Sequence, residues 1–435
     1  MESTMRLVLG EEHVIVQGIR PEEKLWGPYQ FPMPYFLGDR YVVSVHVEED
    51  LIVASGKPTR WFESRDKGVT WQEIGNEIAP ECGLKLANGD KIYFPIEGGV
   101  NLKNYVFPDY SMLTPGYDFG EKAQEGMMPI QDGVTAWWNG DVIRAYKAER
   151  LPDSLSKKEW TIDRMKAGEN TKVREYVPVD WPFLTRVVFD RPGGNMMKPI
   201  TPRGNAKLGP DGNIYVSAFS GEGHLNPENG QYSPYYSAEL FCSEDNGHSF
   251  YQLAHMEYEA DGHDYPYLSG GFSDSDFEFM DDGSMIWFFR SAWMGSTGYE
   301  WAPMYVSRSK DGGHTWDKPT VFAKTGILPR LCKLNCGVTL LCYARPGIFV
   351  QGCYSNDPYH WSEPLEVMTP DDRSHLANIT IKQPSFHEWD GACNNPEILP
   401  LNDNAALLFY SDFYYPDKEG VKRKTILCRE IRVED

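Results

Sequence analysis

The chain has 435 residues, of which 41% are hydrophobic and 14% aromatic, and its formal net charge is −21 at pH 7. So acidic a surface repels polyanions, which disfavours nucleic acid and anionic membranes as partners. No apolar run reaches the length that crosses a bilayer, and the N-terminus lacks a signal-peptide pattern, which favours a cytoplasmic location. The eight cysteines include no C-x-x-C pair, so we expect buried thiols, with no metal site and no cofactor.

Both ends of the chain alternate polar and apolar residues, as a half-buried strand does. The alternation runs through residues 5–20 and returns in residues 425–433. We therefore expect these two segments to pair as outer strands and to join the chain ends.

Short strand signals follow the N-terminal segment and are separated by turn residues. They lie at residues 31–36, 41–47 and 60–64, with a strand–turn–strand signal from residue 83. Residues 98–135 and 147–180 lack this rhythm, and we expect irregular insertions there, with a helix around residues 154–165. Long loops on a rigid scaffold usually build its binding face.

Beyond residue 200 the strand–turn–strand signal returns four times. It covers residues 205–219, 274–290, 329–345 and 395–412. No linker interrupts this rhythm, so residues 1–435 are expected to form one domain.

A pattern of eight residues, S-x-D-x-G-x-T-W, recurs between these strands. Residues 64–71 and 309–316 match it fully, residues 243–250 match it closely, and residues 355–361 match it in part. The aspartate accepts hydrogen bonds from main-chain N–H groups and closes a turn, and the glycine takes a positive φ. Four copies predict repeated hairpins, and therefore a repeat architecture.

These four segments resemble the Asp-box (BNR) repeats of the sialidase superfamily. The resemblance implies an all-β fold, a six-bladed β-propeller, with each box at the turn between the third and fourth strands of a blade. In that family the boxes lie away from the active site, so the resemblance implies glycosidase chemistry by association only.

The segment 274–291 resembles the part of the family in which an acidic residue opens an inner strand and an arginine ends the next. The resemblance places Asp274, with Asp276 as the alternative, at the acidic position, and Arg290 at a position that binds a substrate carboxylate. Arg345 repeats the pattern. The alternative is that these arginines pair with structural aspartates, because a buried arginine needs an acidic partner.

The first predicted blade has Gln30 near the place of the family's first arginine, followed by His46 on the next strand. Glu49 and Asp50 match the family's acid/base aspartate by position. The opening of the last blade carries Glu397 and no tyrosine where the family has its nucleophile. Each acid has the alternative role of a solvated loop or strand residue.

These residues indicate an exo-acting glycoside hydrolase on a small saccharide, with an acidic sugar as one option. Asp50 would be the general acid and Asp274 or Glu397 its partner, since glycoside hydrolysis uses two carboxyl groups. Trp293 and Tyr299 offer rings for sugar stacking, or pack against the outside of the blade. Two alternatives remain: a lyase on a uronic-acid glycan, with His46 or a tyrosine as the base, and a non-catalytic sugar-binding propeller.

Overall fold

The computed structural model describes fifteen stretches of the chain. They are residues 5–20, 30–46, 59–94, 114–118, 144–147, 159–180, 184–185, 206–219, 224–225, 232–233, 236–259, 269–292, 303–344, 347–368 and 395–434. Apart from one 3-10 helix, η2 (Asn76–Glu81), every regular element in them is a strand. The expectation of an all-β protein is therefore confirmed for the described residues.

Four separate antiparallel sheets have four strands each. The first is β2 (Gln30–Phe36), β3 (Tyr41–His46), β4 (Thr59–Ser64) and β5 (Gln72–Ile74). The second is β19 (Ser269–Phe279), β20 (Met285–Ala292), β21 (Met304–Ser309) and β22 (Thr320–Ala323). The third is β23 (Ile327–Lys333), β24 (Val338–Ala344), β25 (Ile348–Tyr354) and β26 (Leu365–Met368). The fourth is β27 (Glu397–Asn402), β28 (Ala405–Pro416), β29 (Lys422–Glu434) and β1 (Arg6–Gln17).

An eight-stranded sheet consists of two sets of four strands joined by the parallel pair β11–β18. One set is β6 (Leu84–Lys85), β7 (Lys91–Tyr93), β10 (Glu159–Met165) and β11 (Val173–Asp180). The other is β13 (Ala206–Leu208), β14 (Ile214–Phe219), β17 (Ala238–Ser243) and β18 (Phe250–Met256). Short strands complete the list: β8 (Thr114–Asp118), β9 (Arg144–Lys147), β12 (Leu184–Thr185), β15 (His224–Leu225) and β16 (Tyr232–Ser233).

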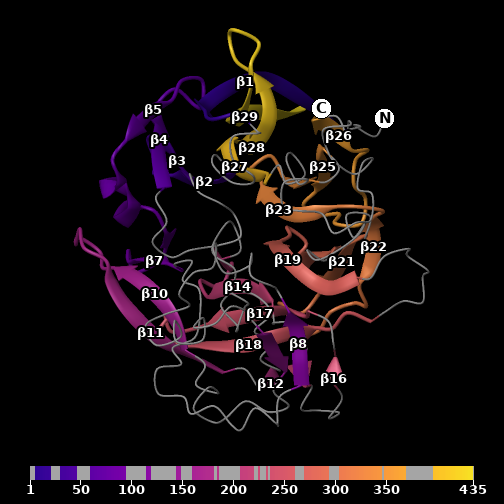
Figure 1. Ribbon diagram of the computed structural model, residues 1–435. Helices are drawn as coiled ribbons and strands as arrows, with labels where there is room; N and C mark the ends of the chain where they lie inside the picture. Colours follow the sequence, from indigo (N-terminus) through magenta and orange to yellow (C-terminus); the bar gives the residue numbers. More distant parts are fainter. Residues whose placement is uncertain are drawn as a thin grey trace.

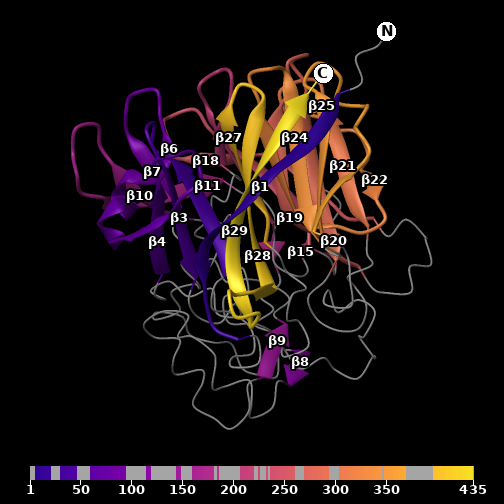
Figure 2. The ribbon, with the colours of Figure 1, turned by 90° about the horizontal axis from the view of Figure 1, so that it is seen from above.

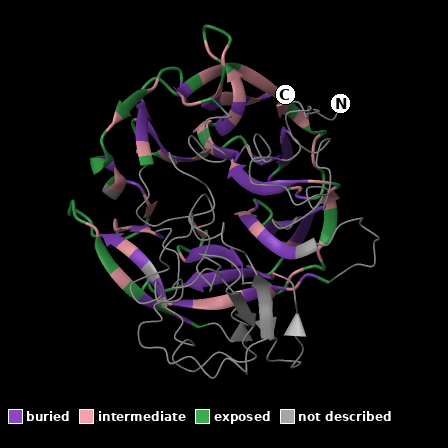
Figure 3. Ribbon diagram, viewed as in Figure 1, coloured by how far each residue is buried: buried purple, intermediate pink, exposed green. Residues whose placement is uncertain are grey.

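The sheets stand around a common centre like the blades of a propeller, and β2, β19, β23 and β27 are the innermost strands of the four-stranded sheets (Figure 1). Five clusters of buried apolar side chains fill the spaces between neighbouring sets of strands. A sixth cluster packs β3 and β4 of the first sheet against η2 and Cys82. Buried residues gather on the inner and middle strands, and exposed ones on the outer strands and turns (Figure 3). Burial of these apolar surfaces holds the ring together.

The two chain ends are joined by strand pairing, as the alternating pattern predicts. β1 runs antiparallel to β29, with Leu7 opposite Val433 and Gln17 opposite Thr425. Figure 2 shows β1 lying along β29 at the rim. The last sheet is therefore assembled from both ends of the chain.

Residues 159–180 form strands, and the helix expected around residues 154–165 is wrong over the described part of that segment. β10 pairs with β11 on one side and with β7 on the other. Trp160, Ile162 and Arg164 are buried, which is the two-residue period of a strand.

The box turns have the hydrogen bonds that their sequence predicts. In residues 309–316, Asp311 accepts from the Thr315 main-chain N–H at 2.8 Å and from its hydroxyl at 2.6 Å. Gly313 has a φ of 95° and donates its N–H to Ser309 Oγ at 2.9 Å. The Trp316 indole donates to the Gly313 carbonyl at 2.8 Å. The same bonds recur in residues 64–71.

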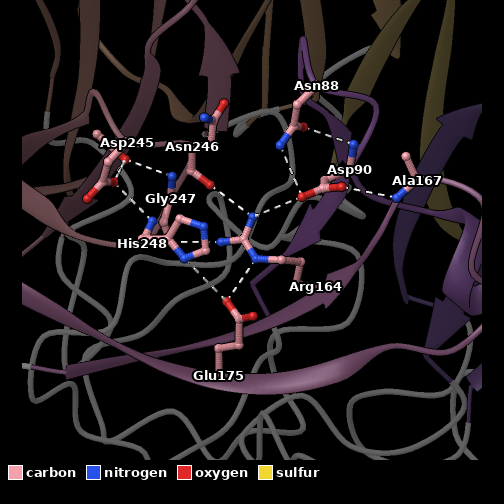
Figure 4. Close-up of polar contacts among 10 residues, drawn as sticks. Asn88, Asp90, Arg164, Ala167, Glu175, Asp245, Asn246, Gly247 and His248 are labelled. Atoms are coloured by element: carbon pink, nitrogen blue, oxygen red, sulfur yellow. Dashed lines mark hydrogen bonds and ion pairs between the residues drawn. The ribbon is translucent and has the colours of Figure 1, made fainter.

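The third copy, residues 243–250, ends in phenylalanine and is supported from the neighbouring set of strands. Arg164 of β10 lies against this turn (Figure 4) and donates to the Asn246 carbonyl at 2.9 Å. Its guanidinium also forms ion pairs with Glu175 at 2.8 Å and Asp90 at 3.8 Å. An acidic partner on each side offsets the cost of burying this arginine.

Candidate functional site

Four of the inner strands share a kink at the same register. Positive φ angles occur at Phe31 (50°), Asp274 (36°), Leu328 (51°) and Asn395 (43°). In the first three cases the pairing register with the next strand shifts there, as at a β-bulge. Bulges re-aim the side chains around them, and positive φ at non-glycine residues is concentrated at functional sites.

The residue two positions after each kink is buried near the centre. These residues are Met33, Asp276, Arg330 and Glu397. Three of the four are charged, which is costly unless the charges have partners. The kinks therefore precede buried charged side chains on the inner strands of three different sheets.

Seven charged residues make up what we call the hub cluster. They are Lys207 of β13, Asp274, Asp276 and Glu278 of β19, Arg290 of β20, Arg330 of β23 and Glu397 of β27. Four carry carboxyl groups and three carry basic groups.

Asp274 and Arg290 form a direct ion pair, with a hydrogen bond from the guanidinium to the carboxylate. The side chain of Arg290 is 5% exposed and that of Asp274 is 17% exposed. Of the two roles that the sequence leaves open for Arg290, the structure places it against an aspartate. The pair lies at the end of β19 and β20 opposite the box turn, because β21 runs from that end toward residues 309–316.

Arg330 and Glu397 form the second pair, which joins β23 to β27. Arg330 Nε lies 3.1 Å from Glu397 Oε1, and both side chains are buried. Burial lowers the pKa of Arg330, but Glu397, Asp276 and Asp274 outweigh it, so the pKa is raised. Arg330 is therefore charged at any physiological pH.

Asp276 is completely buried between β19 and β23. Its carboxylate accepts the Leu331 N–H at 2.8 Å, and Lys207 Nζ lies 3.6 Å away. Burial raises the pKa of Asp276 to about 6, although Lys207 and Arg330 oppose the rise. A carboxyl group tuned in this way suits proton transfer near neutral pH.

Lys207 connects three sets of strands at the centre. Its ammonium group lies 2.8 Å from Glu278 on β19 and 3.4 Å from the Leu331 carbonyl on β23. With Arg330 and Glu397, this gives a run of opposite charges from β13 through β19 and β23 to β27. The sequence brings these residues together from positions almost two hundred apart.

Sequence reasoning missed Arg330 and Lys207. A signal for Arg330 exists in Leu328-Pro329-Arg330, which repeats the form of Asn395-Pro396-Glu397. Both triplets carry the positive φ at the first residue. Lys207 has no comparable signal, because the contact depends on the closure of the ring.

The remaining predicted residues are only partly covered. Gln30 and His46 lie opposite each other on β2 and β3, at the register that Ser273 and Arg290 occupy on β19 and β20. The structure describes their main chain only. Five predicted residues lie outside the described part of the chain: Glu49, Asp50, Trp293, Tyr299 and Arg345.

The described residues contain neither a metal-binding group nor a membrane-spanning helix. Within these ranges, no group of three or more His, Cys, Asp or Glu side chains is arranged to hold a metal ion. They also contain no helix with the length and apolarity that a membrane span requires. The seven cysteines that they include are free thiols.

No family model and no curated protein matches the sequence. The fold, however, resembles solved structures over nearly the whole chain. A protein of unknown function from Dyadobacter fermentans is 14% identical, with 98% of this chain and 99% of that chain covered and a TM-score of 0.56. A sialidase from Streptococcus pneumoniae is 10% identical, with 96% and 70% covered and a TM-score of 0.47. An α-L-arabinofuranosidase from Fusarium graminearum is 11% identical, with 97% and 98% covered and a TM-score of 0.45.

Of these three similarities, that with the Dyadobacter protein alone exceeds a TM-score of one half. At 14% identity this similarity supports the fold only, so the chemistry has to be inferred from the residues of the candidate site.

Proposed function

We propose that this protein is a six-bladed β-propeller glycoside hydrolase that removes a terminal sugar from a small saccharide. The blade count is supported by the six sets of four strands, two of which are joined by the parallel pair β11–β18. The observation that carries the function is the hub cluster, in which carboxyl groups and arginines from different sheets meet at the centre. A few polar groups that converge from different elements are a common feature of small-ligand sites.

Hydrolysis of a glycosidic bond needs one carboxyl group that donates a proton and another that acts on the sugar or on water. In this proposal Asp274 and Glu397 are the candidates for the second role, because both lie at the centre beside an arginine. Asp50, with Glu49 beside it in sequence, supplies the proton. Asp276, completely buried behind them, adds negative charge near Arg330.

The other predicted residues take binding roles. Gln30 and His46, opposite each other on β2 and β3, offer hydrogen bonds to sugar hydroxyl groups, and Arg290 holds Asp274 in place. Arg345 follows β24 in sequence, and Trp293 and Tyr299 follow β20. All three remain candidates for contacts with the sugar.

A panel of aryl glycosides tests the reaction class. A hydrolase releases the aryl group together with reducing sugar from at least one neutral glycoside, and Asp274→Asn and Glu397→Gln abolish the release. A lyase would instead give an unsaturated product that absorbs in the near ultraviolet from a uronic-acid glycan. Binding of sugars without either product would leave a carbohydrate-binding propeller and overturn the proposal.

A further inference from the structure

We infer that the hub cluster takes an uncharged sugar and that Asp274 sets this specificity by occupying Arg290. The inference rests on the proposed function and names its class of substrate. It departs from the expectation that Arg290 binds a sugar carboxylate.

The guanidinium of Arg290 is already hydrogen-bonded to Asp274, and the side chain is 5% exposed. A sugar carboxylate at Arg290 would lie close to the carboxylate of Asp274. Two carboxylates side by side in a largely buried site repel each other, which is unfavourable.

The side chain of Arg330 is 2% exposed and is paired with Glu397, and the charges of Asp274 and Asp276 also act on it. The third basic group, Lys207, lies between Asp276 and Glu278. Each described basic group of the hub cluster thus has an acidic partner, and the carboxyl groups outnumber the basic groups by one.

The charges of the hub cluster also determine the electrostatic potential that a ligand meets. An excess of carboxyl groups at the centre, in a chain of net charge −21, repels an anion. Paired carboxylates and guanidiniums still offer acceptors and donors at their remaining positions. Hydroxyl groups of a neutral sugar can use both kinds of group without bringing a charge into the site.

Binding of neutral and anionic sugars tests the inference directly. The probes are L-arabinose and D-galactose as neutral sugars, and D-glucuronate and N-acetylneuraminate as anionic ones, measured by calorimetric titration. Wild-type protein is expected to bind neither anion. Wild-type binding of an anionic sugar that is lost in Arg290→Met would overturn the inference.

Asp274→Asn is the informative variant, since it removes the charge and asparagine tolerates the φ of 36° at this position. It is expected to gain affinity for D-glucuronate by about tenfold or more, and the gain is expected to vanish in the double variant with Arg290→Met. Asp281→Asn is the matched control: Asp281 pairs with Lys333 near the turn at the other end of β19 and β20, and its loss is expected to leave anion binding unchanged. A folded Asp274→Asn protein without this gain would contradict the inference.

A second variant keeps the test decisive if Asp274→Asn does not fold. Glu397→Gln removes the direct acidic partner of Arg330, and the gain of anion binding expected from it should vanish with Arg330→Met. The outcomes also separate the two proposals. Cleavage of a glucuronide or sialoside by the wild type overturns the inference and leaves the hydrolase standing. If Asp274→Asn gains anion binding but the wild type cleaves no glycoside, the hydrolase proposal is overturned and the inference about Arg290 stands.

Discussion

The guanidinium of Arg164 donates a hydrogen bond of 3.1 Å to the main-chain carbonyl of Gly247. In the two box turns that match the pattern fully, the equivalent glycine carbonyl accepts a hydrogen bond from a tryptophan indole, at 2.9 Å from Trp71 and at 2.8 Å from Trp316. Phe250 has no such donor. An arginine from the adjacent set of strands therefore takes the place of the missing indole (Figure 4).

Replacement of Arg164 is expected to be severe. Arg164→Met leaves the Gly247 carbonyl and Glu175 without this donor, and loss of one partner of a buried pair costs about 3–5 kcal/mol of unfolding free energy. Arg174→Met is the control on the neighbouring strand, where an arginine that is 44% exposed pairs with Asp163. Its loss is expected to cost less than about 1 kcal/mol in urea unfolding. Equal losses in the two variants would contradict this account.

The box glycines give a second prediction. Gly312 and Gly313 both have positive φ, so alanine at either one costs about 1–2 kcal/mol. A Cβ at Gly312 meets nothing within 4 Å, whereas one at Gly313 would lie 3.0 Å from Leu253 and 3.2 Å from Met285. We expect Gly313→Ala to lower the unfolding free energy by about 1–3 kcal/mol more than Gly312→Ala. Denaturant titration of both variants would refute this if the order were reversed.

The box turns could be predicted from the sequence because their chemistry is local. Asp311, Gly313 and Thr315 interact within five residues, so the pattern itself contains the structure. The pairing of β1 with β29 was also predicted, from the strand-like segments at the two ends of the chain. Local and two-residue patterns carry this information without knowledge of the rest of the fold.

Contacts between distant strands could not be read in the same way. A helix was expected around residues 154–165, but the described part of that segment forms β10, which pairs with β7 and β11. Arg330 finds Glu397 sixty-seven residues later, and Lys207 finds Glu278 seventy-one residues later. Such pairs depend on how the sheets close around the centre, which no local pattern records.

A partly buried histidine makes the stability of the fold depend on pH. His255 Nδ1 lies 2.9 Å from Glu239, and Nε2 lies 3.3 Å from Glu257. Burial alone would lower the pKa of His255, but Glu239 and Glu257 outweigh it and raise the pKa to about 9. Because the folded-state pKa exceeds the unfolded value, the protonated ring stabilises the fold fully below pH 6.5, and this contribution is lost as the pH rises toward 9.

The variant His255→Gln should remove this dependence. Wild-type protein is expected to lose thermal stability between pH 6.5 and 9 relative to His255→Gln, with the largest difference between the two at pH 6. His360→Gln is the control, since His360 is 85% exposed and pairs with Asp357 at the surface. If the melting temperatures of wild type and His255→Gln change in parallel with pH across this range, the ion pairs of His255 with Glu239 and Glu257 contribute no pH-dependent stability.

The most direct test of a catalytic hub is the value of kcat/KM for the best neutral aryl glycoside in wild type, Glu397→Gln and Asp274→Asn. We predict losses of roughly 10²- to 10⁴-fold in both folded variants, as expected when a positioned carboxyl group is removed, with Asp281→Asn unchanged. Turnover in both variants within about threefold of wild type, a difference below 1 kcal/mol in the barrier, would contradict the account.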